Sequence, residues 1–194
     1  MPLSFAPDAV ELVDPDPCWH ASWWESAQEF EAAGDHQHGS GLIPDDESDA
    51  DCKGEPWRPA QMGDPGRFAA FCADMRARAD RAVAEQLGYV PDSKLFIVAG
   101  ETFLGSLSLR HELNDWLRRE GGHIGYSVRP SARRRGVAAR ALRLGLDRAR
   151  DLGIDRALAT CEDDNIASAA TILRNGGVLE DVTDGKRRYW IDLR

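Results

Sequence analysis

The sequence predicts a mixed α/β (α+β) fold in which a central sheet of about seven strands is flanked by about four helices. Three observations predict it. Short segments with the alternation typical of strands are interleaved with longer segments of helical period. Gly136 stands where a predicted strand gives way to a predicted helix. The 194 residues, 42% of them hydrophobic, suffice for one domain with a full-sized core.

The first third of the chain predicts one short strand and one helix. The strand covers residues 9–13, and the helix covers residues 22–33, where apolar side chains recur at helical spacing. Gly34 ends the helix in the usual C-terminal position. Residues 34–63 are rich in Gly, Pro and Asp and form a long irregular stretch. We interpret this stretch as an acidic flap near an acceptor site, with disorder as the alternative.

A second helix and a strand pair follow. Asp64 is the predicted N-cap of the helix, which runs to about Gln86 and has Pro65 at its first position. Strands over residues 94–99 and 102–109 are joined by a tight turn. A polar excursion over residues 114–122 separates them from the next strand.

The remaining elements alternate between strand and helix. They are a strand over 123–128, a helix over 138–152, a strand over 156–161, a helix that begins at Asn165, and strands over 178–182 and 187–193. Helical spacing predicts one buried face in each helix. The expected buried residues are Ala138, Ala141, Leu142, Gly145, Ala149 and Leu152 in the first, and Ile166, Ala169, Ala170 and Leu173 in the second.

The charge of the chain is unevenly distributed. Residues 1–65 carry a net charge of −13 and residues 66–194 a net charge of +4, within an overall −9. This asymmetry suggests one surface for an anion and another for a cation, although solubility explains the acidic part equally well. The overall acidity argues against nucleic acid as a partner.

Neither a membrane nor a metal is expected from the sequence. No signal peptide is visible, and the longest apolar stretches are too short to span a bilayer. The four cysteines are scattered without a Cys-x-x-Cys pair, which favours a reduced, cytoplasmic enzyme. Asp35, His36, His38 and Cys52 have no standard zinc spacing, so we predict no metal site.

The segment Arg133-Arg134-Arg135-Gly136-Val137-Ala138 is the most informative in the chain. A glycine at a strand-to-helix junction lets the backbone approach a ligand, and the first-turn amides of the helix point outward at the positive end of its dipole. Such a geometry binds pyrophosphate. Arg129 also lies near the glycine, although 21 Arg against 3 Lys make the cluster partly a matter of composition. The Walker and Gly-x-Gly-x-x-Gly patterns are both absent.

The pattern Arg-x-x-Gly-x-Ala, followed in order by a helix, a strand and Asn165, resembles the GNAT superfamily of N-acetyltransferases. The central motif of that family is Gln/Arg-x-x-Gly-x-Gly/Ala. The resemblance covers residues 94–194 well and the first 90 loosely. It implies a single acetyltransferase domain over 1–194, with a variable acceptor side in 1–93 and a cofactor-binding core in 94–194. It also implies a GNAT-like sheet that splays between the motif strand and the next parallel strand.

The resemblance implies acetyl-CoA as acetyl donor, bound in that splay. The pantetheine arm would add to the backbone of the motif strand, and the Val128 amide would polarise the acetyl carbonyl. The pyrophosphate would bind the amides and arginines of the motif. The implied cofactor-binding residues are Tyr126, Ser127, Val128, Arg133, Arg134, Arg135, Gly136, Val137, Ala138 and Asn165.

The catalytic groups are less well defined. The family often has a tyrosine seven residues after the asparagine, as proton donor to the thiolate, but Ile172 stands there. Tyr126 and Tyr189 are candidate replacements, and a thiol with a pKa of about 8.5 can also leave without an acid. His123 is our nominal base. His111, Glu112 and ordered water are the alternatives.

Two functions follow. The first is an N-acetyltransferase that moves an acetyl group to a primary amine of a small molecule or protein by direct attack on the thioester. The acidic front half favours a cationic acceptor. The alternative is a non-catalytic acyl-CoA-binding sensor or interaction module of the same fold, which the departure at Ile172 keeps open. The acceptor, the acyl length and a homodimeric state are left undetermined.

Overall fold

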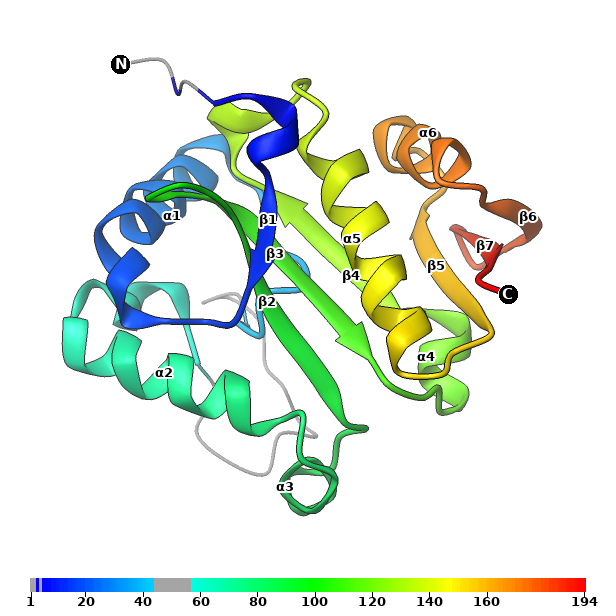
Figure 1. The fold of residues 1–194 in the computed structure, drawn as a ribbon, viewed down its shortest axis with the longest axis horizontal. Coiled ribbons are helices and arrows are strands. Elements are labelled where there is room, and N and C mark those ends of the chain that lie inside the picture. Colours follow the sequence, from blue (N-terminus) through cyan, green and yellow to red (C-terminus); the bar gives the residue numbers. More distant parts are fainter. Residues whose placement is uncertain (1–2, 4, 44–56) are drawn as a thin grey trace.

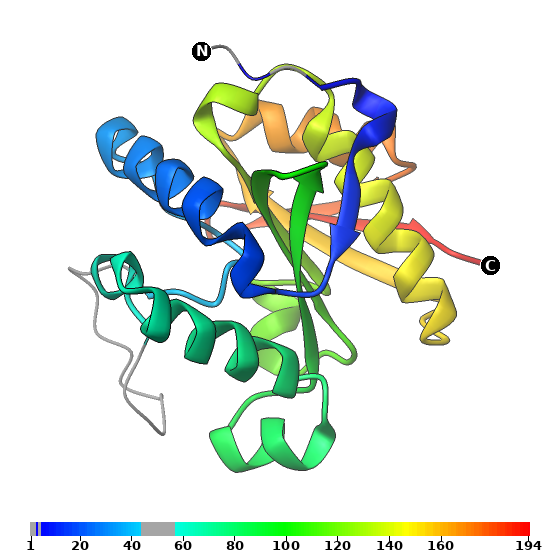
Figure 2. The ribbon, with the colours of Figure 1, turned by 60° about the vertical axis from the view of Figure 1, so that its left-hand side comes forward.

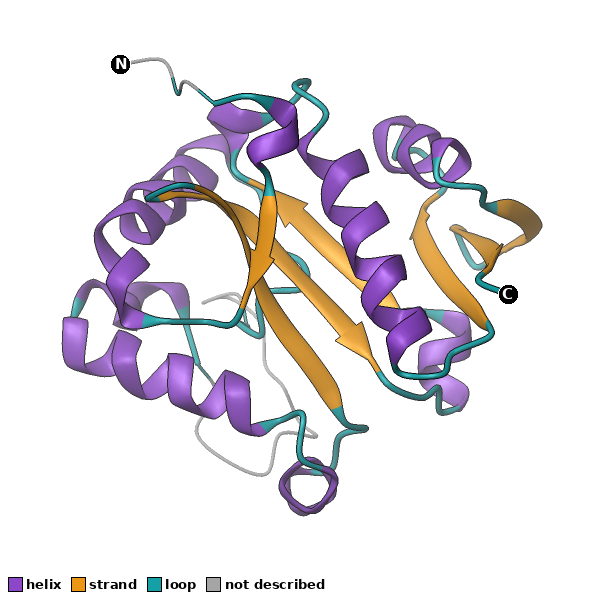
Figure 3. Ribbon diagram, viewed as in Figure 1, coloured by secondary structure: helices purple, strands orange, loops and turns teal. Residues whose placement is uncertain are grey.

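The computed structural model describes residue 3 and residues 5–43 and 57–194. Seven strands form one mixed sheet in the order β1-β2-β3-β4-β5-β7-β6, which confirms the predicted fold class (Figure 3). The strands are β1 (Glu11–Val13), β2 (Asp92–Ala99), β3 (Thr102–Arg110), β4 (Ile124–Val128), β5 (Arg156–Glu162), β6 (Val178–Thr183) and β7 (Lys186–Asp192). The α-helices are α1 (His20–Ala33), α2 (Pro65–Ala77), α3 (Arg81–Leu87), α4 (Asp115–Arg119), α5 (Val137–Asp151) and α6 (Ile166–Arg174).

The sheet separates two layers of helices. Helices α1 and α2 cover one face, and α5 and α6 cover the other (Figures 1 and 2). Each layer has its own core. Trp23, Phe68 and Phe103 are fully buried under α1 and α2, while Leu107 and Leu142 are fully buried under α5.

The parallel strands β4 and β5 separate soon after they meet. Ile124↔Ala159 is their single register pair, whereas β3 pairs with β4 along its whole length, from Leu109↔Ile124 to Gly105↔Val128. The second half of β4 therefore has an edge that no strand occupies. The predicted splay is confirmed.

The predicted second helix is two helices. Asp80 interrupts it, because its carboxylate accepts hydrogen bonds from the amides of Ala82 and Val83 and so caps α3. The polar excursion contains the short helix α4, which Asn114 caps through the amide of Leu117. These two features raise the number of α-helices among the described residues to six, rather than about four. In both cases a capping side chain within a polar stretch was the signal.

The buried faces of α5 and α6 differ in part from those predicted. In α5, Leu152 lies beyond the helix and is 49% exposed. In α6 the buried residues are Ala169 and Ile172, whereas Ile166 and Leu173 are more than half exposed. The expected face was wrong because α6 is apolar on several sides, so helical spacing alone cannot choose among its faces.

The start of the acidic stretch lies on the α1 side of the sheet. Gly34 ends α1 in the left-handed conformation, as predicted, with φ at 66°. Gly39 lies directly against β4, since a Cβ on it would come within 2.5 Å of the Gly125 carbonyl oxygen. A 3-10 helix, Pro59–Gly63, ends the stretch. The flap predicted over 34–63 falls partly on residues 44–56, which lie outside the described residues.

None of the helices in the described part of the chain combines the length and the apolar character needed to cross a membrane.

Candidate functional site

The first-turn amides of helix α5 have no side-chain cap among the described residues, and they lie beside an open space. Gly136 is its N-cap at φ 80°, and no side chain caps the helix. A Cβ built on Gly136 would meet nothing within 4 Å. Arg134 also has a positive φ, 62°, a backbone conformation that is uncommon for residues other than glycine. Helices α2, α3, α4 and α6 by contrast have capping side chains. The first-turn amides of α5 are therefore available to an anion.

The arginines of the motif differ in their contacts. Arg134 has no side-chain partner among the described residues. Arg133 donates from Nη1 to the Asp35 carboxylate at 2.6 Å and from Nε to the Val128 carbonyl at 3.1 Å. Arg135 donates to the Leu3 carbonyl at 2.7 Å and stacks on the Phe5 ring. The structure thus leaves one motif arginine without a side-chain partner and ties two to residues far away in sequence.

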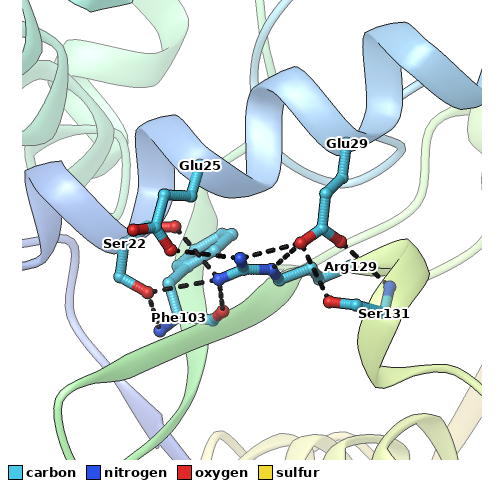
Figure 4. Close-up of polar contacts among 6 residues, drawn as sticks. All are labelled: Ser22, Glu25, Glu29, Phe103, Arg129 and Ser131. Carbon is cyan, nitrogen blue, oxygen red and sulfur yellow. Dashed lines mark hydrogen bonds and ion pairs between the residues drawn. The ribbon is translucent and has the colours of Figure 1, made fainter. Parts of the chain in front are cut away.

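Arg129 is a structural residue and does not face the glycine, so its expected place among the surrounding arginines was wrong. It is 4% exposed and lies between Glu25 and Glu29 of α1 (Figure 4). Its Nε donates to Glu29 at 2.8 Å, and its Nη2 pairs with Glu25 at 3.2 Å. The other oxygen of Glu29 accepts from the Ser131 amide at 2.9 Å. The cluster therefore ties α1 to the turn that precedes the motif.

Burial raises the pKa of Glu29, but the hydrogen bonds from Arg129 and Ser131 outweigh it, so the pKa of this carboxyl lies below its usual value. Glu29 is therefore ionised at neutral pH and keeps the buried guanidinium compensated.

The outer edge of β4 presents peptide groups to the splay. The Arg129 amide donates to Leu104 of β3, so the peptide groups of the alternate residues Tyr126 and Val128 face the other way. The contact from Arg133 to the Val128 carbonyl agrees with this direction. The side chain of Ser127 lies on the α1 face, 8% exposed, and its hydroxyl has no partner among the described residues.

A pair of hydroxyl groups lies between β4 and α6. The Tyr126 hydroxyl is 3.0 Å from that of Ser168. Ser168 stands in the first turn of α6, where its amide donates to the capping oxygen of Asn165. The side-chain oxygen Oδ1 of Asn165 is thus used as a helix cap, and the side-chain NH₂ group of Asn165 has no partner among the described residues. Burial raises the pKa of Tyr126, so this hydroxyl stays protonated at neutral pH.

The position expected for the family tyrosine belongs to the core. Ile172 is fully buried, and Gly177 packs so closely on it that a Cβ there would lie 2.5 Å from Ile172 Cγ2. Tyr189, the other tyrosine considered, is 2% exposed within the same core. Tyr126 is therefore the tyrosine that reaches the start of α6.

His123 is a poor candidate for the base. Its Nδ1 accepts the amide of Leu158 at 2.9 Å, which joins β4 to β5 where they still touch. Burial, helped by the charges of Arg118 and Arg110, lowers the pKa of His123 to about 4. The ring is 7% exposed and its accepting nitrogen is already used, so the contacts disfavour proton abstraction.

The alternative bases also have partners. His111 lies 2.8 Å from the Ser93 hydroxyl, and Glu112 binds Arg81 through both oxygens. Both follow the end of β3 that lies beside the start of β4, whereas the motif follows the end of β4. No group of three or more His, Cys, Asp or Glu in the described residues could hold a metal ion. Cys52, considered from its sequence context as a possible metal ligand, lies outside the described residues.

The contacts of three residues at the site were missed in the sequence: those of Glu29, Asp35 and Ser168. Ser168 had a local signal, since it stands three residues after the helix-capping Asn165. Glu29 and Asp35 had none, because their partners Arg129 and Arg133 lie 100 and 98 positions away.

Comparisons with known proteins agree with this geometry. The family model described as "Acetyltransferase (GNAT) domain" matches residues 56–178, which is more than half of the chain. The chain therefore belongs to the GNAT family of acetyltransferases, and the resemblance noted in the sequence is confirmed. A comparison with curated protein sequences gives no match.

Solved structures share the fold over nearly the whole chain. RimJ of Mycobacterium smegmatis, in complex with CoA-disulfide, is 20% identical to this chain, with a TM-score of 0.65. The match covers 94% of this chain and 81% of the RimJ chain. The Microcin C7 self immunity acetyltransferase MccE, in complex with acetyl-CoA and AMP, is 16% identical with a TM-score of 0.61, covering 95% and 93%. RimL, a ribosomal L7/L12 alpha-N-protein acetyltransferase in complex with coenzyme A, is 19% identical with a TM-score of 0.59, covering 100% and 98%. At these identities the likeness establishes the fold.

Proposed function

We propose that the protein binds acetyl-CoA between β4 and β5 and transfers its acetyl group to a primary amine. One observation carries the proposal: the uncapped start of α5 lies under open space at Gly136 and follows the unoccupied edge of β4. A cofactor with a pyrophosphate and an amide-containing arm matches both features. The solved complexes of RimJ, RimL and MccE support the cofactor class.

Different residues of the chain would bind the pyrophosphate, the pantetheine arm and the acetyl group. The bound cofactor supplies an activated acetyl thioester. The amides of residues 134–138, with the side chains of Arg133 and Arg134, hold the pyrophosphate by charge-assisted hydrogen bonds. The outward peptide groups of Tyr126 and Val128 hold the arm, and the Val128 amide also polarises the acetyl carbonyl. Asn165 offers its NH₂ group from the start of α6.

Tyr126 is our proposed proton donor to the departing thiolate, with Ser168 fixing its hydroxyl. The Tyr126→Phe variant is expected to lower kcat roughly tenfold. This is less than the ~10²–10⁴ typical of general acid catalysis, because a thiol with a pKa near 8.5 leaves readily. Thiol release at saturating substrates measures the effect, and CoA affinity should not change. A variant with unchanged kcat would remove Tyr126 from the mechanism. Ser168→Ala, which loses only the orienting contact, should show a smaller decrease.

The acceptor side is proposed to be built by residues 1–93 within a single domain. Its acidic composition favours a cationic acceptor, either a small amine or a protein amino group. RimL, described as a ribosomal L7/L12 alpha-N-protein acetyltransferase, is an example of the fold with a protein amino group as acceptor. Neutralising the acidic residues of the flap should raise the acceptor KM. These residues lie outside the described part of the chain and are Asp45, Asp46, Glu47, Asp49 and Asp51. The cytoplasm is the proposed location.

Calorimetry with CoA, followed by a thiol-release assay over a panel of amines, tests the proposed function. We expect micromolar CoA binding and turnover with at least one cationic amine or peptide. Tight binding with no turnover over the whole panel would favour the acyl-CoA sensor, the alternative that Ile172 in place of the family tyrosine keeps open. Absence of CoA binding would overturn both functions.

A further inference from the structure

Arg133 joins the proposed cofactor site to the acceptor side of the sheet. Its Nη1 pairs with Asp35 at 2.6 Å, and both side chains are 41% exposed. Its guanidinium lies 5.6 Å from the centre of the Phe30 ring. Its Nε occupies the Val128 carbonyl, a group that the arm of the cofactor would use. Two parts of the proposed cofactor site, a guanidinium and a strand carbonyl, are thus engaged by the chain itself.

Asp35 begins the segment 35–43, which lies on the motif strand. Its amide donates to the Phe30 carbonyl at the end of α1, which fixes where the segment starts. Four residues later Gly39 lies against Gly125, with its Cα 4.0 Å from the position of a Gly125 Cβ. Ile124 and Tyr126 point to the α5 side, so this contact is on the opposite, acceptor face of β4. The first part of the segment is therefore attached at Arg133 and at the motif strand. Its end is held separately, because the Ile43 amide donates to the Trp57 carbonyl at 2.9 Å and Leu42 packs on the core under α1 and α2.

We propose that the pyrophosphate of the cofactor displaces Asp35 from Arg133 and thereby loosens residues 35–40 on the acceptor face of β4. The inference rests on the proposed function. Asp35 occupies Nη1 of Arg133, so a pyrophosphate bound by the same guanidinium brings a second anion close to the Asp35 carboxylate, and the two anions repel each other. The ion pair is half-exposed, so little free energy opposes its loss. The same displacement frees the Val128 carbonyl, because Nε moves with the guanidinium.

Removing the charge of Asp35 should therefore tighten cofactor binding, which is the opposite of what damage to the site would do. For Asp35→Asn we expect the calorimetric Kd for CoA to fall roughly two- to fivefold, which is the strength of a typical exposed ion pair. Glu101→Gln removes the same charge from the exposed turn between β2 and β3 and should leave Kd unchanged.

A double-mutant cycle separates competition from general electrostatics. In an Arg133→Gln background, Asp35→Asn should no longer change Kd, because the competition acts through the guanidinium. The same tightening in both backgrounds would mean that Asp35 acts by long-range charge, and the proposal would be wrong. An unchanged or weakened Kd for Asp35→Asn alone would also overturn it.

Hydrogen exchange measures the segment directly. In the wild type, saturating CoA should increase the exchange of the amides of residues 36–40, while in Asp35→Asn their exchange should already be fast without CoA. Stronger protection of these amides on CoA binding would contradict the proposal. Wild-type protein that fails to bind CoA would overturn the proposed function instead, so the two failures are distinguishable.

Discussion

Replacing Gly136 by glutamate is expected to weaken CoA binding by at least about 100-fold. The new side chain and its negative charge would occupy the open space above the first turn of α5, where the pyrophosphate is expected. Two charge-assisted hydrogen bonds to phosphate, at ~1.5 kcal/mol or more each, account for a change of this size. Calorimetric titration with CoA, at protein concentrations that resolve a millimolar Kd, measures it.

The fold should survive the substitution. A Cβ at Gly136 meets no atom within 4 Å, so the cost is the strain of a left-handed residue, ~1–2 kcal/mol. A glutamate at the start of a helix is also favourable to the helix dipole. Loss of binding can therefore not be attributed to loss of α5.

Gly153 provides a matched control at the other end of α5. It has nearly the same φ, 79° against 80°, and the same open surroundings. Gly153→Glu carries equal strain and places its charge at the unfavourable end of the dipole, so it should destabilise the protein at least as much. We expect it to bind CoA like the wild type. Equal affinity of Gly136→Glu and Gly153→Glu would place the pyrophosphate elsewhere.

The features that could be predicted from the sequence are those encoded locally. The glycine, the strand before it and the helix after it lie within about thirty residues of one another, and hydrophobic periodicity marks both elements. The splay followed from the family resemblance carried by the same segment. Helix ends were predictable where a capping residue was recognised, as at Asp64 and Gly34, and were missed where one was overlooked, as at Asp80.

The features that could not be predicted depend on partners distant in the chain. Nothing beside Arg129 in the sequence distinguishes it from Arg134, yet one is buried between two glutamates and the other has no side-chain partner. In the sequence, His123 is a reasonable candidate base within an alternating strand. In the structure its Nδ1 accepts a hydrogen bond from the Leu158 amide. In each case the partner comes from another element, and periodicity carries no information about which elements meet.

Replacing Arg129 by methionine is expected to lower the free energy of unfolding by about 3 kcal/mol or more. Arg129 is 4% exposed, and its removal leaves the partly buried Glu29 carboxylate without its cation. Breaking a buried ion pair from one side typically costs ~3–5 kcal/mol, because the remaining charge stays desolvated. For a chain of this length the melting temperature should fall by roughly 6–12 °C. Urea and thermal unfolding measure both quantities.

The matched control is Arg140→Met on α5, where the exposed arginine has no side-chain partner among the described residues. A change within about 0.5 kcal/mol is expected there. If Arg129→Met were no more destabilising than this control, the cluster in Figure 4 would not hold α1 to the motif.

Lowering the pH should reproduce part of this loss of stability, because it protonates the Glu29 carboxylate that pairs with Arg129. The pKa of this group is lower in the folded protein than in the unfolded chain, so its contribution is complete above the unfolded value of about 4.3. The contribution disappears as the pH falls through the lower, folded pKa. Glu29→Gln should therefore be less stable than the wild type at pH 7, and the difference should shrink toward pH 3. A difference that stays constant over this range would assign the stabilisation to side-chain packing and not to the charge of Glu29.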